Sequence, residues 1–145
     1  MKKEQAKVKV GIIVFKDNFI LLGKKPESTS KHSSGLDNLG EWVVPQGFIS
    51  FGESFEQAAY KKLKEKTTLQ AKNLKVMQIS NHLSEKGHSI TVGVLCTDFH
   101  GKPRTTNMQK VVSWLWFPVD NLPMQIGSLS KKLLKNFFEE SFYKH

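Results

Sequence analysis

The stretch GFISFGESFEQAAYKKLKEKTTL, residues 47–69, decides the fold. Its first six residues, Gly47–Gly52, are rich in turn formers and lead into a helix that begins near Glu53 and Ser54. Ser54 is a predicted N-cap, and Gln57, three residues later, is the predicted partner of a capping box. The sequence therefore predicts a loop followed at once by a well-started helix.

Apolar residues and two lysines share one face of this helix. The apolar members recur at helical spacing and form an arc: Phe55, Ala58, Ala59 and Leu63. At about 100° per residue, Lys62 and Lys66 fall inside that arc. We expect the first half of the helix to pack on a core and the second half to line a polar site. The alternative is that both lysines extend past the core edge into solvent.

Strand patterns flank the stretch on both sides. Residues Lys7–Lys16 alternate, with Val8, Val10, Ile12 and Val14 on one face. Asp17 and Asn18 predict a turn, and 19–25 is the returning strand of a hairpin. Further strands are expected at 74–83, 89–96 and 111–117. On the last of these, Trp114 and Trp116 share one face, and a Trp there can pack in the core, which we favour, or stack on a nucleotide base.

The C-terminal part of the chain predicts a second amphipathic helix, beginning near Ser128. Its apolar stripe comprises Leu129, Leu133, Leu134, Phe137, Phe138 and Phe142. We expect this stripe to pack on the sheet. It is wide enough for part of it to serve a homodimer contact.

Length and composition fit one domain, residues 1–145, with a substantial core. The single cysteine, Cys96, is expected to be a buried thiol, which favours a reducing, cytoplasmic location. No run is long and apolar enough to span a membrane, and the N-terminus does not resemble a signal peptide.

The charge of the chain points to an anionic partner. The net charge is +9, although simple solubility would also account for it. Arg104 is the only arginine, which argues against bidentate reading of DNA bases and leaves attraction to phosphate.

The stretch 47–69 resembles the Nudix box of the MutT-like hydrolases, G-x5-E-x7-R-E-U-x-E-E-x-G-U, where U is aliphatic. The matching positions are Gly47, Glu53, Leu63, Glu65 and Leu69. Lys61 stands at the arginine, Lys62 and Lys66 stand at two of the glutamates, and Thr68 stands at the glycine. The resemblance implies an α+β fold, a single-domain α/β/α sandwich with a mixed central sheet.

The resemblance also implies a chemistry and its residues. Nudix hydrolases cut diphosphate linkages with Mg²⁺ or Mn²⁺, which neutralises phosphate charge and activates water. By position, Glu65 and Glu53 are the catalytic candidates, and Glu65 with the carbonyl of Gly47 would hold the metal weakly. The implied phosphate-binding residue at the end of the second strand is Lys24 or Lys25, and we favour Lys25.

The lysines at carboxylate positions change what this site is expected to do. Ammonium groups repel a divalent cation, but they bind phosphate directly as point charges. Lys61, Lys62 and Lys66 are therefore predicted to contact substrate phosphate. Mg²⁺ or Mn²⁺ is expected as a cofactor only if the protein still hydrolyses its substrate.

Three functions remain open. The first is a pyrophosphohydrolase with weakened catalysis, and the second is a non-catalytic nucleotide-binding protein. The third is a protein-interaction module that keeps the fold. The lead-in Trp42–Gly47 resembles the branch acting on RNA 5′ ends and dinucleotide polyphosphates, whereas the C-terminal half resembles the nucleoside-triphosphate branch.

Overall fold

The central strand of the fold is β1 (Lys7–Lys16). The computed structural model describes residues 5–26, 40–85, 87–106, 111–140 and 143–144. β1 pairs antiparallel with β2 (Phe19–Lys24) and β4 (Gln46–Phe48), and parallel with β7 (Gly87–Cys96). Asp17 and Asn18 have φ values of 55° and 67°, the left-handed conformation that a tight hairpin turn requires. The predicted hairpin is confirmed.

The remaining strands extend the sheet on both sides. β6 (Lys75–Ser84) pairs antiparallel with β7, and β10 (Tyr143–Lys144) pairs parallel with β6. On the other side, β3 (Trp42–Val43) and β9 (Ser113–Pro118) both pair antiparallel with β2. The sheet is therefore mixed. A short strand, β8 (Phe99–His100), follows β7 and pairs antiparallel with β5 (Gln70–Ala71).

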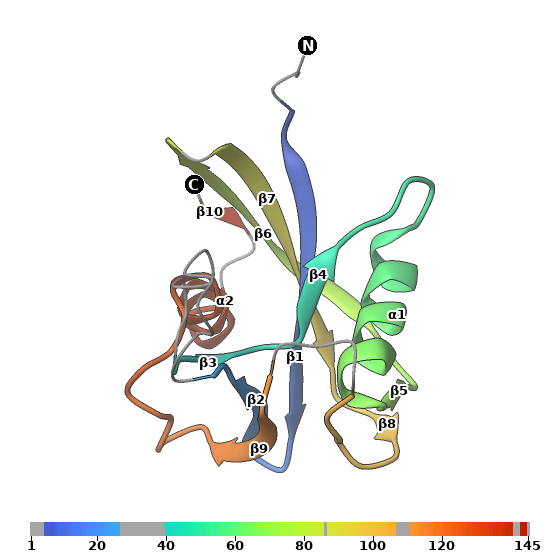
Figure 1. The fold of residues 1–145 in the computed structure, drawn as a ribbon, viewed down its shortest axis with the longest axis vertical. Coiled ribbons are helices and arrows are strands. Elements are labelled where there is room, and N and C mark those ends of the chain that lie inside the picture. The colour runs from blue at the N-terminus through green and yellow to red at the C-terminus, as the bar shows by residue number, and fades with distance from the viewer. Residues whose placement is uncertain (1–4, 27–39, 86, 107–110, 141–142, 145) are drawn as a thin grey trace.

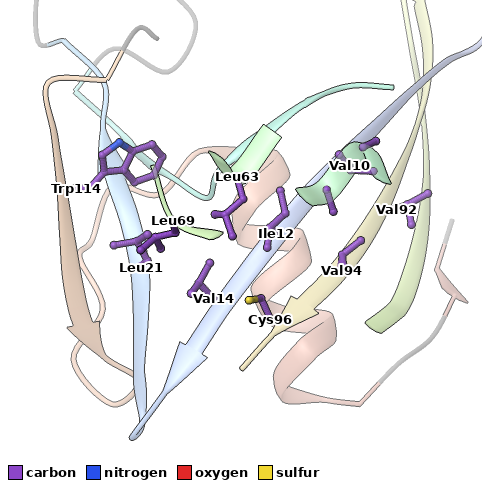
Figure 2. Packing of buried hydrophobic residues seen from close by; sticks show 12 residues of the cluster. Val10, Ile12, Val14, Leu21, Leu63, Leu69, Val92, Val94, Cys96 and Trp114 are labelled. Atoms are coloured by element: carbon purple, nitrogen blue, oxygen red, sulfur yellow. The ribbon is translucent and has the colours of Figure 1, made fainter. Parts of the chain in front are cut away.

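Helix α1 (Phe55–Thr67) covers one face of the sheet. The capping box is present: Gln57 N donates to Ser54 Oγ at 3.0 Å, and Ser54 N donates to Gln57 Oε1 at 2.8 Å. Beneath α1, buried side chains from β1, β2, β7 and β9 gather around Leu63 and Leu69 (Figure 2). Trp114 is 8% exposed and belongs to this cluster, as predicted.

Helix α2 (Ser128–Phe138) covers the opposite face (Figure 1). Its core comprises Ile13, Ile20, Leu22, Val44, Leu133 and Leu134. Alternate residues of β1 thus supply two cores, since Ile12 and Val14 belong to the α1 side. This arrangement confirms the predicted α/β/α sandwich.

Two predictions about the helices need correction. Phe55 is 37% exposed, because it is the first residue of α1 and follows an exposed loop. Core packing instead continues into the second half of α1, where Leu63 and Thr67 are fully buried. On α2, Phe138 is 47% exposed at the last turn, so it does not pack on the sheet as expected.

Other expectations concern single residues. Cys96 is buried, and its thiol donates to the Asp98 carbonyl at 3.3 Å. Burial raises the pKa of the Cys96 thiol. Phe142, from the predicted stripe, lies outside the described residues. Neither α1 nor α2, the helices of the described ranges, is long and apolar enough to cross a membrane.

Candidate functional site

The loop between β4 and α1 is folded around Glu53. Ser50 N donates to Glu53 Oε1 at 2.8 Å, and Glu53 N donates back to the Ser50 carbonyl at 3.1 Å. Gly52 has a φ of 88°, which a glycine adopts without strain. The second carboxylate oxygen of Glu53 lies 3.8 Å from Lys61 Nζ on α1. Glu53 and Lys61, two predicted site residues, therefore tie the loop to the helix.

Lys62 lies across Gly47. A Cβ atom on Gly47 would stand 2.7 Å from Lys62 Cδ and 2.9 Å from Lys62 Cε, so only glycine leaves room for the lysine in this position. The ammonium of Lys62 lies 3.6 Å from Glu65 Oε1. The two side chains are 20% and 33% exposed, so the pair is partly shielded from water. The structure thus brings together Gly47, Lys62 and Glu65.

The last turn of α1 is held by side chains from elsewhere in the chain. Thr106 Oγ1 donates to the Glu65 carbonyl at 3.0 Å, and Trp114 Nε1 donates to the Lys66 carbonyl at 3.0 Å. These bonds satisfy two of the carbonyls that a helix C-terminus leaves without an intrahelical partner. The backbone of Glu65 and Lys66 is therefore fixed against the sheet.

Lys9 of β1 is a further, partly buried lysine. Burial lowers the pKa of Lys9, and the positive charges of Lys25 and Lys66 lower it further. Lys9 alternates with Gly11 and Ile13, so it lies on the face of β1 that packs against α2, opposite α1.

An exposed aromatic ring adjoins Lys9. Phe48 of β4 is paired with Lys9 across the sheet, and it is 49% exposed. The ammonium groups of Lys9 and Lys7 lie 5.1 Å and 5.7 Å from the centre of its ring. Both distances fall within the range of cation–π attraction.

The donors around Glu65 do not fit a tightly held divalent cation. Mg²⁺ is held by oxygen ligands, with carboxylates supplying the charge. In the part of the chain that the structure describes, no group of three or more histidine, cysteine, aspartate or glutamate side chains could hold a metal ion. Glu65 instead faces an ammonium group. The assignment of Gly47 and Glu65 as metal ligands stays a prediction.

Proteins of similar sequence include two kinds of hydrolase. The ADP-ribose pyrophosphatase of Methanocaldococcus jannaschii is 28% identical over 132 residues, which cover 90% of this chain and 72% of that protein. The NAD-capped RNA hydrolase NudC of Edwardsiella ictaluri is 24% identical over 127 residues, covering 86% of this chain. This chain spans less than half of that NudC, 45% of its length.

Solved structures share the fold. The MutT NUDIX hydrolase from Burkholderia pseudomallei superposes with a TM-score of 0.77 at 22% identity, covering 91% of this chain and 98% of that one. The NUDIX domain of Shewanella oneidensis NrtR, complexed with ADP ribose, gives a TM-score of 0.72 at 23% identity, covering 94% and 89%. At such identities the likeness concerns architecture alone. The sequence model of the NUDIX domain matches residues 6–137, and with this match over most of its length the chain belongs to the NUDIX domain family.

Proposed function

We propose that this chain binds the diphosphate group of a nucleoside-diphosphate-linked compound through lysine side chains, with metal-dependent hydrolysis weak or lost. The observation that carries the proposal is the position of Lys62. Its methylene groups lie over Gly47, and its ammonium group faces Glu65. A cation of the protein itself therefore stands beside the carboxylate that the family resemblance assigns to the metal.

The electrostatic argument favours an anionic ligand over a divalent cation. Two unit charges about 4 Å apart interact by about 4 kcal/mol at an effective dielectric constant near 20, and less when water reaches them. At such distances, the charges of Lys62 and Lys66 repel a Mg²⁺ ion with an energy of this order. The same charges attract phosphate oxygens. The positive charges of Lys25 and Lys66 both act on Lys9, so the potential at Lys9 is also positive.

The names of the relatives narrow the ligand class. The relatives are an ADP-ribose pyrophosphatase, an NAD-capped RNA hydrolase and a domain complexed with ADP ribose. The compounds in these names all contain an ADP group joined through its diphosphate. We therefore take ADP-ribose and NAD as the first ligands to test. Each presents two phosphates for Lys62 and Lys66 on α1 and for Lys25, which follows β2.

The experiment that tests this proposal is a calorimetric titration of ADP-ribose into protein treated with EDTA. Binding without metal is the expected result, and Lys62→Gln and Lys66→Gln should each weaken it. Lys72→Gln is the control, because Lys72 is exposed and is not among the predicted site residues. Absence of binding without metal would contradict the proposal.

A second candidate function is a slow pyrophosphohydrolase. It is favoured by the presence of both Glu53 and Glu65 at the positions of the family motif. A screen of nucleoside triphosphates, dinucleotide polyphosphates, ADP-ribose and triphosphorylated RNA with Mg²⁺ and Mn²⁺ separates the two functions. Turnover at about 1 per second or faster, within the usual range of enzymes, favours the hydrolase.

A further inference from the structure

One side chain, Trp114 of β9, contacts both the end of β2 and the end of α1. Its Nε1 donates to the Lys66 carbonyl in the last turn of α1 at 3.0 Å. Its ring lies over Gly23 of β2, its partner across the sheet, because a Cβ atom on Gly23 would stand 2.7 Å from Trp114 Cε3. The indole therefore fills the space between β2 and α1, at the margin of the core that α1 covers (Figure 2).

Lys25 lies two residues beyond Gly23, directly after the end of β2. Its amide donates to the Glu41 carbonyl at 2.9 Å, so its backbone continues the pairing of β2 with β3. Side chains two positions apart on a strand point to the same face, so Lys25 shares the face of Gly23, which is the face that α1 covers. The indole of Trp114 thus joins the backbone segments of Lys25 and Lys66 on one side of the sheet.

The bond from the indole matters most for Lys66. The last carbonyls of a helix have no intrahelical donor, so its last turn is held less firmly than its middle. Lys66 is the next-to-last residue of α1, and its carbonyl is one of these. Trp114 is 8% exposed and packed in the core, so its N–H is shielded from water and fixed in place. The bond therefore fixes where the Lys66 side chain begins.

We propose that Trp114 is a positioning residue that sets the spacing of Lys25 and Lys66, and that this spacing makes the site select a diphosphate over a monophosphate. A diphosphate presents two charged groups at a limited separation, so a pair of ammonium groups held at a matching separation gains contacts that a single phosphate does not offer. Because the indole holds α1 against β2, less freedom is lost when the ligand binds. The inference rests on the proposed function, which assigns the phosphates to these lysines.

The test compares the affinities of ADP and AMP for the whole chain without metal, measured by calorimetry. The native chain should bind ADP about tenfold tighter than AMP or more, since the second phosphate adds at least one hydrogen bond to a charged group. Trp114→Phe keeps an aromatic ring and removes the N–H group. It should lower the ratio of the two affinities about threefold or more, with a smaller effect on AMP.

A double-mutant cycle separates positioning from a general loss of stability. If Trp114 acts through Lys66, Trp114→Phe should change the ADP affinity less than about twofold in a chain that already carries Lys66→Gln. In a chain that carries Lys62→Gln, the same change should keep its effect, because Lys62 lies one turn before the bonded carbonyl. Gly23→Ala is the second variant, should Trp114→Phe not fold, because its Cβ displaces the indole from the other side.

Trp116→Phe is the matched control. Trp116 lies two residues along β9 on the same face, and its ring stacks on Phe99 with 5.6 Å between the ring centres. The control should leave the ratio of ADP to AMP affinity unchanged. Thermal unfolding of each variant confirms that it is folded at the temperature of the titrations.

The outcomes separate this inference from the proposed function. An unchanged ratio in folded Trp114→Phe overturns the inference and leaves the proposed function standing. An equal loss of ADP affinity with and without Lys66→Gln also overturns it, because the indole then has a structural role only. If the native chain binds neither nucleotide, the proposed function fails, and the inference fails with it.

Discussion

The Lys62 ammonium lies 3.6 Å from the Glu65 carboxylate, and the methylenes of Lys62 cover Gly47. The two residues are three positions apart on α1, so their side chains lie on neighbouring positions of one helix face. Thr106 and Trp114 hold the last turn of that helix in place. The helix backbone beside the ion pair is therefore held in place, and the pair itself can be tested by changing the charge at each position.

Replacing Lys62 and Lys66 with glutamate should restore affinity for a divalent cation. The change reverses two charges beside Glu65, so repulsion of Mn²⁺ becomes attraction. Each charge pair is worth up to about 4 kcal/mol, and even a third of that at both positions raises the affinity for Mn²⁺ about 100-fold. Calorimetric titration with Mn²⁺ measures it. The control is Lys64→Glu with Lys72→Glu, which changes the net charge equally at exposed positions. Equal Mn²⁺ affinity in the two double variants counts against this account.

Gly47→Ala should displace Lys62 without unfolding the protein. The new Cβ would stand 2.7 Å from Lys62 Cδ, and a flexible, partly exposed side chain can move away. We expect the free energy of unfolding to change by less than about 1 kcal/mol, while ADP-ribose affinity falls. Urea unfolding and calorimetry measure the two effects.

Gly93→Ala is the matched control for the stability measurement. A Cβ there would meet the side chain of Gln78, which is fully buried and bonded to the Leu133 carbonyl at 2.8 Å. Because Gln78 cannot move freely, Gly93→Ala should cost about 1–3 kcal/mol. Similar costs at both glycines would mean that Lys62 is held more rigidly than we infer.

Lys9 should couple ligand binding to proton uptake. Burial, then the charges of Lys25 and Lys66, lower the pKa of Lys9 from the ordinary lysine value of 10.5. A bound phosphate offsets those charges and raises that pKa again, so protons are taken up between the lowered value and 10.5. Titrations at one pH in that window, in two buffers of different ionisation enthalpy, measure the uptake. Lys9→Met should abolish it, and unchanged uptake in Lys9→Met would assign the proton to another group.

The same shift has a consequence for stability. Since the folded state holds the Lys9 proton less tightly than the unfolded chain, the free energy of unfolding should rise with pH between the lowered pKa and 10.5. Below the lowered pKa, Lys9 is charged in both states and its burial destabilises the fold. Lys9→Met should therefore stabilise the protein at neutral pH, and the gain should shrink as pH rises through the window.

Ser54→Ala should destabilise α1 by about 1 kcal/mol, because it removes the oxygen that accepts from Gln57 N. Ser128→Ala is the control, since Ser128 lies inside α2 and the cap of that helix, Gly127, makes no side-chain hydrogen bond. Urea unfolding of both variants compares the costs. An equal loss at Ser54 and Ser128 would show that the capping box adds nothing.

Local patterns in the sequence predicted much of the fold. The alternation of β1 gave its bounds, and the capping box gave the start of α1, because both depend on neighbours along the chain. The short strand β8 was not predicted, since two residues carry no period and their pairing with β5 is a tertiary contact. The exposure of Phe55 and Phe138 likewise depends on where the sheet ends, which helical spacing does not reveal.

The sequence predicted which residues form the candidate site better than it predicted how their side chains are arranged. The positions of Gly47, Glu53 and Glu65 followed from the motif, and the spacing of Lys62 and Glu65 allowed an ion pair. The position of Lys62 over Gly47 was not predicted, because it depends on how α1 packs against β4, where Gly47 has no side chain to exclude the lysine. The lowered pKa of Lys9 was not predicted, because its causes are burial and the charges of Lys25 and Lys66, residues far from Lys9 in the sequence.

The most direct test of the central claim is the titration of ADP-ribose into metal-free protein, repeated with Lys62→Gln. The account predicts binding in EDTA, weakened in the variant and not strengthened when Mg²⁺ is added to the native chain. Binding that requires Mg²⁺, with unchanged affinity in Lys62→Gln, would contradict it.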